Sequence, residues 1–403
     1  MAEQMTIPST SRVVSIDRFR GLIVFCMMFF IAAADFPCLG IFARIANNST
    51  TGRIMLFKGM SLADLADPIF LFLISLSYRG SFLRRSQKSG KRAYVHFLMR
   101  YLCFMGVGSI IVSAEYLLVG NGKDPYFIQT LLMFLVAVLF VVYAVLKPIK
   151  RVSGKAKDGV KTAMVAALVL MGLIGIVLGI RDDILIFIQH NNENLYKHWS
   201  ILHEIGMTGL LVLPFIHLNL KGRIVSWFAV GICYTLLQML PGVIEMFDVV
   251  VLGGLLGTVG WFLLMFGGTI LMEFYQRETN HKSYSFALLV LGVLAAVTCV
   301  FLPMNTSAVT VNYVLFALFA AAVLFGLINL LNAWDPKVKY LVWWGRNPMP
   351  LFLIGLVLRV IQKMWHPAAD TPLTIALLFT LGGMAFLSAI AWYLYKKDII
   401  LRF

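Results

Sequence analysis

Carboxylates at the ends of two neighbouring apolar segments are the residues of this chain best suited to chemistry. Asp35 lies near the far end of the first apolar segment, and Asp64 and Asp67 stand where the second one begins. A carboxylate at bilayer depth costs on the order of 3 kcal/mol on insertion scales and is kept only where it is paired, lines a wet cavity or reacts. We therefore expect these three residues to line an outward-facing polar pocket, in which one of them is a general base.

The spacing of two of these carboxylates indicates how the second helix begins. Asp64 and Asp67 are three residues apart, so a helix would place both on one face. Asp64 has a second interpretation, in which it stabilises the helix start by opposing the macrodipole. Asp67 precedes Pro68, which favours a broken helix start, and such a start is better placed beside a cavity than against lipid.

The composition indicates that the chain is embedded in a membrane. Hydrophobic residues make up 60% of the 403 residues, while charged residues make up 13%, against about 25% in soluble proteins. Apolar runs of about 17–25 residues predict transmembrane helices, and their lack of alternation excludes a β-barrel. We predict an all-α, polytopic transmembrane helix bundle with about 10–12 spans, forming a single domain over residues 1–403.

Twelve apolar segments are candidate spans, of which the sixth and the eleventh are the weakest. They cover residues 21–42, 62–82, 97–119, 127–146, 161–180, 204–219, 223–243, 253–273, 284–303, 309–332, 343–363 and 372–396.

Basic residues gather in short loops and predict the orientation of the bundle. Segments 79–96 and 147–161 each carry six Lys or Arg residues and are separated by two spans, so both should face the cytoplasm. Both termini are then cytoplasmic, with residues 1–20 as an N-terminal cytoplasmic segment, and residues 43–61 and 181–203 form outward-facing loops. Because these loops account for the net charge of +15, we expect a lipid bilayer as a partner and no nucleic acid.

Polar residues at the cytoplasmic ends of two spans could bind an anion. Asp17 and Arg20 are three residues apart and either form a structural ion pair or present Arg20 to a phosphate. Asn347 precedes Pro348 at the start of a span, where the free N–H groups of a helix end suit a phosphate. Helix capping explains Asn347 equally well.

Short motifs occur along the chain in a fixed order: SIDRFRGLIVFCMMF, KGMSLADLADPIFLFLISLS, GSIIVSAEY, DPYFIQTLL, GGLLGTVGWFLLMFGG, GRNPMPLFLIG and YLYKKDIILRF. In these motifs the chain resembles the heparan-α-glucosaminide N-acetyltransferase family of transmembrane acyltransferases, and it looks like a short prokaryotic-type member. The resemblance implies transfer of an acyl group from cytoplasmic acyl-CoA to a sugar on the far side of the membrane. It also implies Asp17, Arg20, Gln129 and Asn347 as coenzyme-binding residues, because each matches a family motif.

The chain departs from this family at the reactive residue. The family's acyl-accepting histidine belongs to the outward loop between the first two spans, but His96 is the first histidine of this chain. His203 or His198 could replace it from the outward side, although a surface or acceptor-contact role fits them as well. With the family's histidine gone, we expect direct transfer in a ternary complex, assisted by one of the outer carboxylates, rather than a covalent acyl-enzyme.

The resemblance, together with the apolar segments, therefore implies a multi-pass acyltransferase of the bacterial cytoplasmic membrane. Its donor would be acetyl-CoA or another acyl-CoA, its acceptor an extracytoplasmic sugar or cell-envelope glycan, and no metal is expected. A homodimer is compatible with this prediction. The alternative is a non-catalytic relative that acts as a transporter, a flippase or an accessory subunit of an envelope-modifying complex. Binding of acetyl-CoA distinguishes the two.

Overall fold

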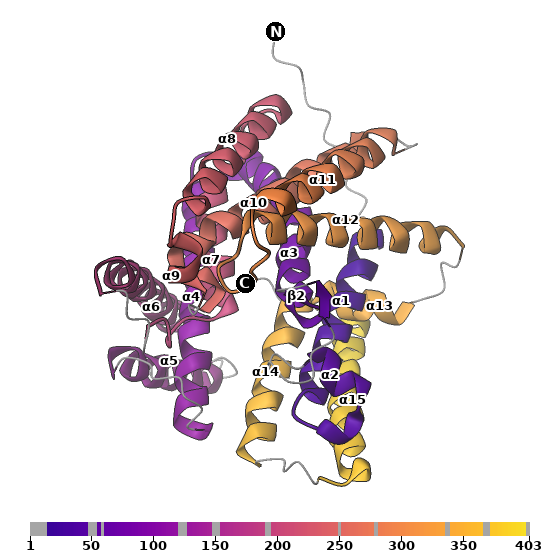
Figure 1. The fold of residues 1–403 in the computed structure, drawn as a ribbon. Helices are drawn as coiled ribbons and strands as arrows, with labels where there is room; N and C mark the ends of the chain where they lie inside the picture. Colours follow the sequence, from indigo (N-terminus) through magenta and orange to yellow (C-terminus); the bar gives the residue numbers. More distant parts are fainter. Residues whose placement is uncertain are drawn as a thin grey trace.

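The computed structural model is an all-α bundle with one small β-hairpin (Figure 1). The structure describes residues 14–46, 55–57, 60–119, 127–146, 154–189, 195–248, 251–277, 281–334, 339–365 and 371–399. Parts of the predicted cytoplasmic N-terminal segment (1–13) and of the first predicted outward loop (47–54 and 58–59) lie outside these ranges.

Each of the twelve predicted spans contains an observed helix. The main helices are α1 (Val14–Ala33), α3 (Ala66–Ser89), α4 (Arg92–Val119), α5 (Phe127–Leu146), α6 (Gly154–Gln189), α7 (Ile201–Val212), α8 (Leu220–Gln238), α10 (Gly254–Arg277), α11 (Lys282–Phe301), α12 (Val311–Trp334), α13 (Lys339–Arg346), α14 (Pro348–Met364) and α15 (Leu373–Lys396). Shorter elements join them: η1 (Pro37–Leu39), α2 (Ile41–Ala46), β1 (Met55–Phe57), β2 (Met60–Ser61), η2 (Ala63–Leu65), α9 (Val243–Phe247) and η3 (Val251–Gly253). The all-α polytopic bundle is confirmed.

Seven described helices are long and apolar enough to cross a membrane, and an eighth is added if the bent pair α13–α14 is one span. The other helices at predicted spans are α1 and α3, which begin with charged first turns, and the shorter apolar helices α5 and α7. The number of 10–12 spans and the orientation of the termini therefore stay predictions.

The two spans predicted to be weakest are the ones that the structure shortens or breaks. The sixth span contains only the 12-residue α7. The eleventh bends by 88° between α13 and α14, and the bend falls at Asn347-Pro348. Proline lacks an N–H donor and restricts the residue before it, so a helix ends readily at this dipeptide.

Helix α6 corrects the predicted outward loop 181–203. It is 36 residues long and continues through residues 181–189, which are helical rather than a loop. The charged sequence Arg181-Asp182-Asp183 interrupts the apolar pattern but not the helix, because both carboxylates find hydrogen-bond donors in Tyr196. Only the remainder of the segment, before α7, is non-helical where it is described.

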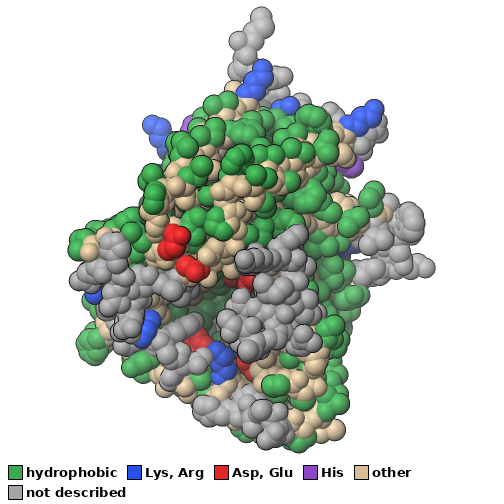
Figure 2. All heavy atoms as spheres, viewed as in Figure 1, with side chains coloured by type: hydrophobic (Ala, Val, Ile, Leu, Met, Phe, Trp, Pro, Cys, Tyr) green, Lys and Arg blue, Asp and Glu red, His purple; other side chains and the backbone are tan. Residues whose placement is uncertain are grey.

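Small residues allow close contact between helices. A Cβ atom added at Gly345 of α13 would lie 1.6 Å from the carbonyl oxygen of Asp17, and one at Gly21 would lie 1.8 Å from that of Leu341. Helices α1 and α13 therefore pack backbone to backbone, as small residues permit in membrane bundles. Helix α10 lies in the interior, while large apolar side chains of α5, α6, α8, α11 and α15 are exposed and cover much of the surface in Figure 2.

Candidate functional site

A buried polar network lies where α4, α5, α6, α7 and α10 meet. Its members share a position inside an otherwise apolar bundle, and hydrogen bonds or close polar contacts link them within three groups. They are Ser109, Gln129, Asp182, Asp183, Tyr196, His198, Ser200, His203, Glu204 and Thr258. We call this set the polar network. Buried polar groups inside a membrane bundle are costly and by default mark a functional site.

One group of the polar network surrounds His203. Its Nε2 atom lies 3.0 Å from Ser109 Oγ on α4, and its Nδ1 atom lies 2.9 Å from Ser200 Oγ. A Cβ atom at Gly108 would lie 2.8 Å from Nδ1, so only glycine leaves room for the ring at this point of α4. Gln129 Nε2 also donates to Ser109 Oγ at 3.4 Å.

These contacts favour one tautomer of His203. Because the hydroxyl of Ser109 accepts from Gln129, its own proton is available for His203 Nε2. The other nitrogen, Nδ1, then carries the imidazole proton and donates it to Ser200. A serine hydroxyl held against an imidazole that a third group orients is the arrangement that activates a hydroxyl or accepts a proton from one.

A second group of the polar network contains Glu204, which follows His203 in α7 and therefore faces different helices. Trp199 Nε1 donates to Glu204 Oε1 at 2.6 Å, and Thr258 Oγ1 donates to Oε2 at 3.1 Å. The Trp199 ring also stacks on His203, with centroids 4.9 Å apart and an interplanar angle of 25°. The side chain of Glu204 is fully buried. Through its hydrogen bonds to Trp199 and Thr258, this carboxylate connects the loop before α7 with the first turns of α10.

Tyr196 connects the same loop to α6 and α10. Its hydroxyl lies 2.5 Å from Asp183 Oδ1 and 2.9 Å from the carbonyl oxygen of Gly179, and it accepts from the N–H of Leu255 at 2.8 Å. A Cβ atom at Gly254 would lie 2.8 Å from the Tyr196 ring. Glycine at that position thus lets the start of α10 approach the loop.

His198 is held in the same loop and is electrically neutral at physiological pH. Burial, together with the smaller effect of the positive charge of Arg181, lowers the pKa of its imidazole to about 4. Its Nδ1 atom lies 3.6 Å from Asp182 Oδ2, which also accepts from the backbone N–H of Tyr196 at 2.9 Å. His198 therefore packs as a neutral polar side chain.

Asp35 and Asp64, two of the carboxylates that the sequence singles out, have different polar partners in the structure. Asp35 Oδ2, past the end of α1, lies 3.9 Å from Arg359 Nε and 3.5 Å from Gln362 Nε2, both on α14. Asp64 instead accepts from the backbone N–H and the hydroxyl of Ser61, each at 2.7 Å. Among the described residues, no hydrogen bond or ion pair joins Asp35 to the carboxylates at the start of α3.

Asp67 is the predicted carboxylate that lies towards the polar network. It is half-buried in the first turn of α3, and it is close enough to Asp64 and Glu204 to interact with both electrostatically. Tyr313 packs over this helix start and donates to the carbonyl oxygen of Asp64 at 2.6 Å. The predicted break falls in η2, before Asp67, because Pro68 is tolerated in the first turn of a helix.

The predicted coenzyme-binding residues fall into two places. Asp17 and Arg20 form the expected contact within α1, at 3.8 Å, and Asp17 lies against α13. Asn347 does not cap α14 with its side chain but donates to the carbonyl oxygen of Ile399 at 2.9 Å. Gln129, by contrast, belongs to the polar network.

Several residues of the polar network carry no signal that singles them out in the sequence. Ser109 and Thr258 are small polar residues inside apolar helices, which are common in membrane proteins. Tyr196 precedes α7 in a segment without periodicity. Glu204 could have been found, because it is a carboxylate within an apolar run, which is the criterion applied to Asp35.

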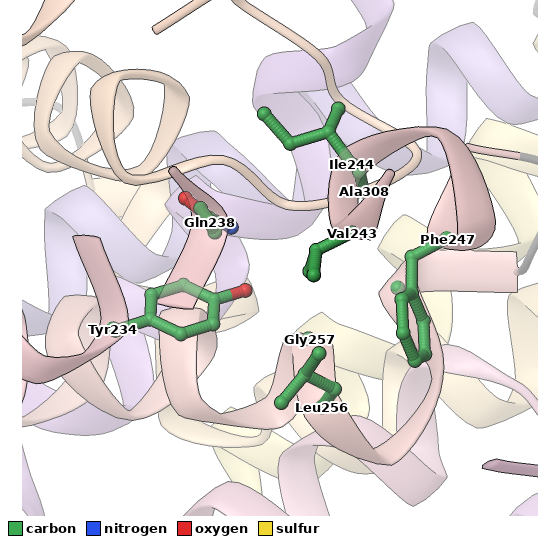
Figure 3. A pocket seen from close by; sticks show the side chains of 9 residues that line it. Tyr234, Gln238, Val243, Ile244, Phe247, Leu256, Gly257 and Ala308 are labelled. Carbon is green, nitrogen blue, oxygen red and sulfur yellow. The ribbon is translucent and has the colours of Figure 1, made fainter. Parts of the chain in front are cut away.

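A small cavity of about 10 Å³, roughly the space that one water molecule needs, lies beside the start of α10. Tyr234 and Gln238 of α8 face Val243 and Phe247 of α9 across it, with Gly257 of α10 at its edge (Figure 3). It is smaller than the cavities of roughly 300–1,000 Å³ that hold drug-sized ligands. On the face drawn in Figure 2, acidic side chains (red) and a basic one (blue) border a recess near the middle of the molecule. Within the described ranges, no three His, Cys, Asp or Glu side chains are grouped to hold a metal ion.

The fold and this network define a class: an all-α, multi-pass membrane protein with a polar site buried inside its helix bundle. Comparison with known proteins does not narrow the class, because neither a protein-family model nor a curated protein matches the chain. The resemblance of the short motifs to transmembrane acyltransferases therefore enters the functional argument as a proposal.

Proposed function

We propose that this chain is an acyltransferase of the bacterial cytoplasmic membrane. It takes an acyl group, most simply acetyl, from cytoplasmic acyl-CoA and delivers it to an extracytoplasmic sugar or envelope glycan. The observation that carries the proposal is His203, an imidazole inside the bundle with a serine hydroxyl on each nitrogen. A proton acceptor in this position is what a hydroxyl or amine acceptor needs in order to attack a thioester.

The proposed chemistry is direct transfer. The acceptor oxygen or nitrogen attacks the thioester carbonyl, a new C–O or C–N bond forms, and the C–S bond to the coenzyme breaks. His203 Nε2, which Ser109 contacts in this structure, takes the acceptor proton and returns it to the departing thiolate. Trp199, whose ring stacks on His203 and whose Nε1 donates to Glu204, holds the imidazole in place during this transfer.

The test is a transfer assay with the full chain in proteoliposomes, using labelled acetyl-CoA outside and amino sugars or envelope glycan fragments inside. His203→Gln should lower the rate at least about 100-fold, as loss of a general base does. His217→Gln is the matched control, because His217 is exposed and its side-chain partner in the described part of the chain, Tyr94, lies outside the polar network. Absence of transfer by the wild type, or full activity of His203→Gln, would refute the proposal.

A second candidate function is transport of an anionic or lipid-linked substrate. Two observations favour it: the 88° bend between α13 and α14, and the kink at the start of α10, where Leu252, Gly253 and Gly254 all have positive φ. Discontinuous helices of this kind form substrate sites in transporters. Substrate-dependent uptake without acetyl-CoA binding would support transport and exclude transfer.

A further inference from the structure

The hydroxyl of Ser109 meets the geometric requirements of a nucleophile. Its Oγ atom lies 3.0 Å from His203 Nε2, and the hydroxyl of Ser200 lies 2.9 Å from the other ring nitrogen. A hydroxyl within hydrogen-bond reach of an imidazole, which is itself oriented by a third group, is the arrangement that activates serine nucleophiles. Ser109 and His203 are both almost completely buried, so bulk water does not compete for this contact.

The orientation of the imidazole selects Ser109 rather than Ser200. Gln129 Nε2 donates to Ser109 Oγ at 3.4 Å, which leaves the proton of this serine for His203 Nε2. The other ring nitrogen, Nδ1, carries the imidazole proton and donates it to Ser200, so it has no lone pair with which to accept a proton from that serine. Ser109 is therefore the serine that His203 can deprotonate.

Polar groups beside Ser109 can stabilise the oxyanion that forms when a serine attacks a carbonyl group. Ser113 lies one turn further along the same face of α4, about 6 Å from Ser109 along the helix axis. Its hydroxyl is buried and has no hydrogen-bond partner in the described part of the chain, so it can donate to a new ligand. The amide of Gln129, which already contacts Ser109, is a second donor beside the same hydroxyl.

We propose that Ser109 accepts an acyl group from thioesters and activated esters when no acceptor occupies the site, and that the protein thereby hydrolyses them. Ser109 Oγ attacks the carbonyl carbon, a new C–O bond forms, and the bond from that carbon to the leaving thiol or alcohol breaks. His203 Nε2 takes the serine proton and gives it to the leaving group. A water molecule then attacks the acyl-serine, its proton returns through His203 to Ser109 Oγ, and the carboxylic acid is released. The reaction with acyl-CoA rests on the proposed function, whereas the reaction with small esters needs only the two side chains.

The experiment uses two probes that need neither coenzyme nor acceptor. The full-length protein in neutral detergent is treated with diisopropyl fluorophosphate or with p-nitrophenyl acetate, and the modified peptide is identified by mass spectrometry. Both probes should modify Ser109, and His203→Gln should slow the modification at least about 100-fold, as loss of a general base does. Ser75→Ala is the matched control, because Ser75 is equally buried but donates to the carbonyl oxygen of Phe72 instead of an imidazole. It should leave the modification unchanged.

A second variant gives a gain of reactivity, which a misfolded protein would not show. Ser109→Cys keeps the size of the side chain and should replace the reaction with the fluorophosphate by a reaction with iodoacetamide, which His203→Gln should slow in the double variant. An unmodified Ser109 in the wild type, or equal rates in the wild type and His203→Gln, would overturn this proposal. Modification of Ser109 without transfer from acetyl-CoA would refute only the proposed function, and transfer without modification would refute only this inference.

Discussion

The hydroxyl of Tyr196 should contribute more to the free energy of unfolding than that of an ordinary buried tyrosine. Tyr196→Phe removes the partner of the Asp183 carboxylate, at 2.5 Å, and of the Leu255 N–H group, at 2.8 Å. Loss of a hydrogen bond to a charged group costs about 1.5–3 kcal/mol, and loss of a neutral one costs about 1 kcal/mol. We expect Tyr196→Phe to lower the free energy of unfolding by about 3 kcal/mol.

The matched control for this substitution is Tyr284→Phe. Tyr284 is also buried, but its hydroxyl makes a single neutral hydrogen bond, to the carbonyl oxygen of Ala322 at 2.6 Å. Its loss should cost about 1 kcal/mol. Unfolding by SDS in mixed micelles, followed by tryptophan fluorescence, gives both free energies. If Tyr196→Phe costs no more than Tyr284→Phe, the hydroxyl does not anchor the loop that holds Ser200 against His203.

Three further predictions concern pH, helix contact and ion pairing. Because the pKa of His198 is lowered to about 4, the unfolded chain binds its proton first as the pH falls. The free energy of unfolding should therefore drop by about 3 kcal/mol in total between about pH 6.5 and pH 4. The measurement compares the pH dependence of unfolding of the wild type with that of His198→Asn, which should lack this drop. Gly345→Ala would place a Cβ atom 1.6 Å from a carbonyl oxygen of α1 and should destabilise the chain by more than about 3 kcal/mol in a thermal-unfolding assay. Gly382→Ala is the control, because its Cβ atom would meet no atom within 4 Å, and it should have little effect in that assay. Lys363→Met removes the ammonium group that lies 2.5 Å from the Glu115 carboxylate. It should destabilise the chain by up to about 3 kcal/mol, and a double-mutant cycle with Glu115→Gln should recover part of this loss.

The helices of this protein could be predicted from the sequence because their cause is local. Lipid offers no partner to a backbone N–H or C=O group, so an apolar run of sufficient length must be helical. Local rules also predicted the pairing of Asp17 with Arg20, since residues three apart meet on one helix. They identified the short α7 and the bend at Pro348 as the weak spans.

The candidate site could be predicted only in part. Asp67 and His203 were selected as reactive groups, and the structure places His203 in the polar network and Asp67 beside it. Asp35 was grouped with Asp67 because both lie at the predicted outer end of a span. In the structure, the polar partners of Asp35 lie on α14. Helix ends at the same depth of a membrane need not contact the same neighbours, because the sequence does not state which helices pack against each other.

The sequence by itself determined that this chain folds as a multi-pass helix bundle, because hydropathy and the needs of the backbone act over one helix at a time. Only the tertiary structure decided which polar side chains meet. Ser109 reaches His203 across 94 positions of the chain, and Arg223 reaches Glu273 across 50. Such pairs depend on the faces that helices turn towards one another, and those faces are set by the packing of small and large side chains over the whole bundle.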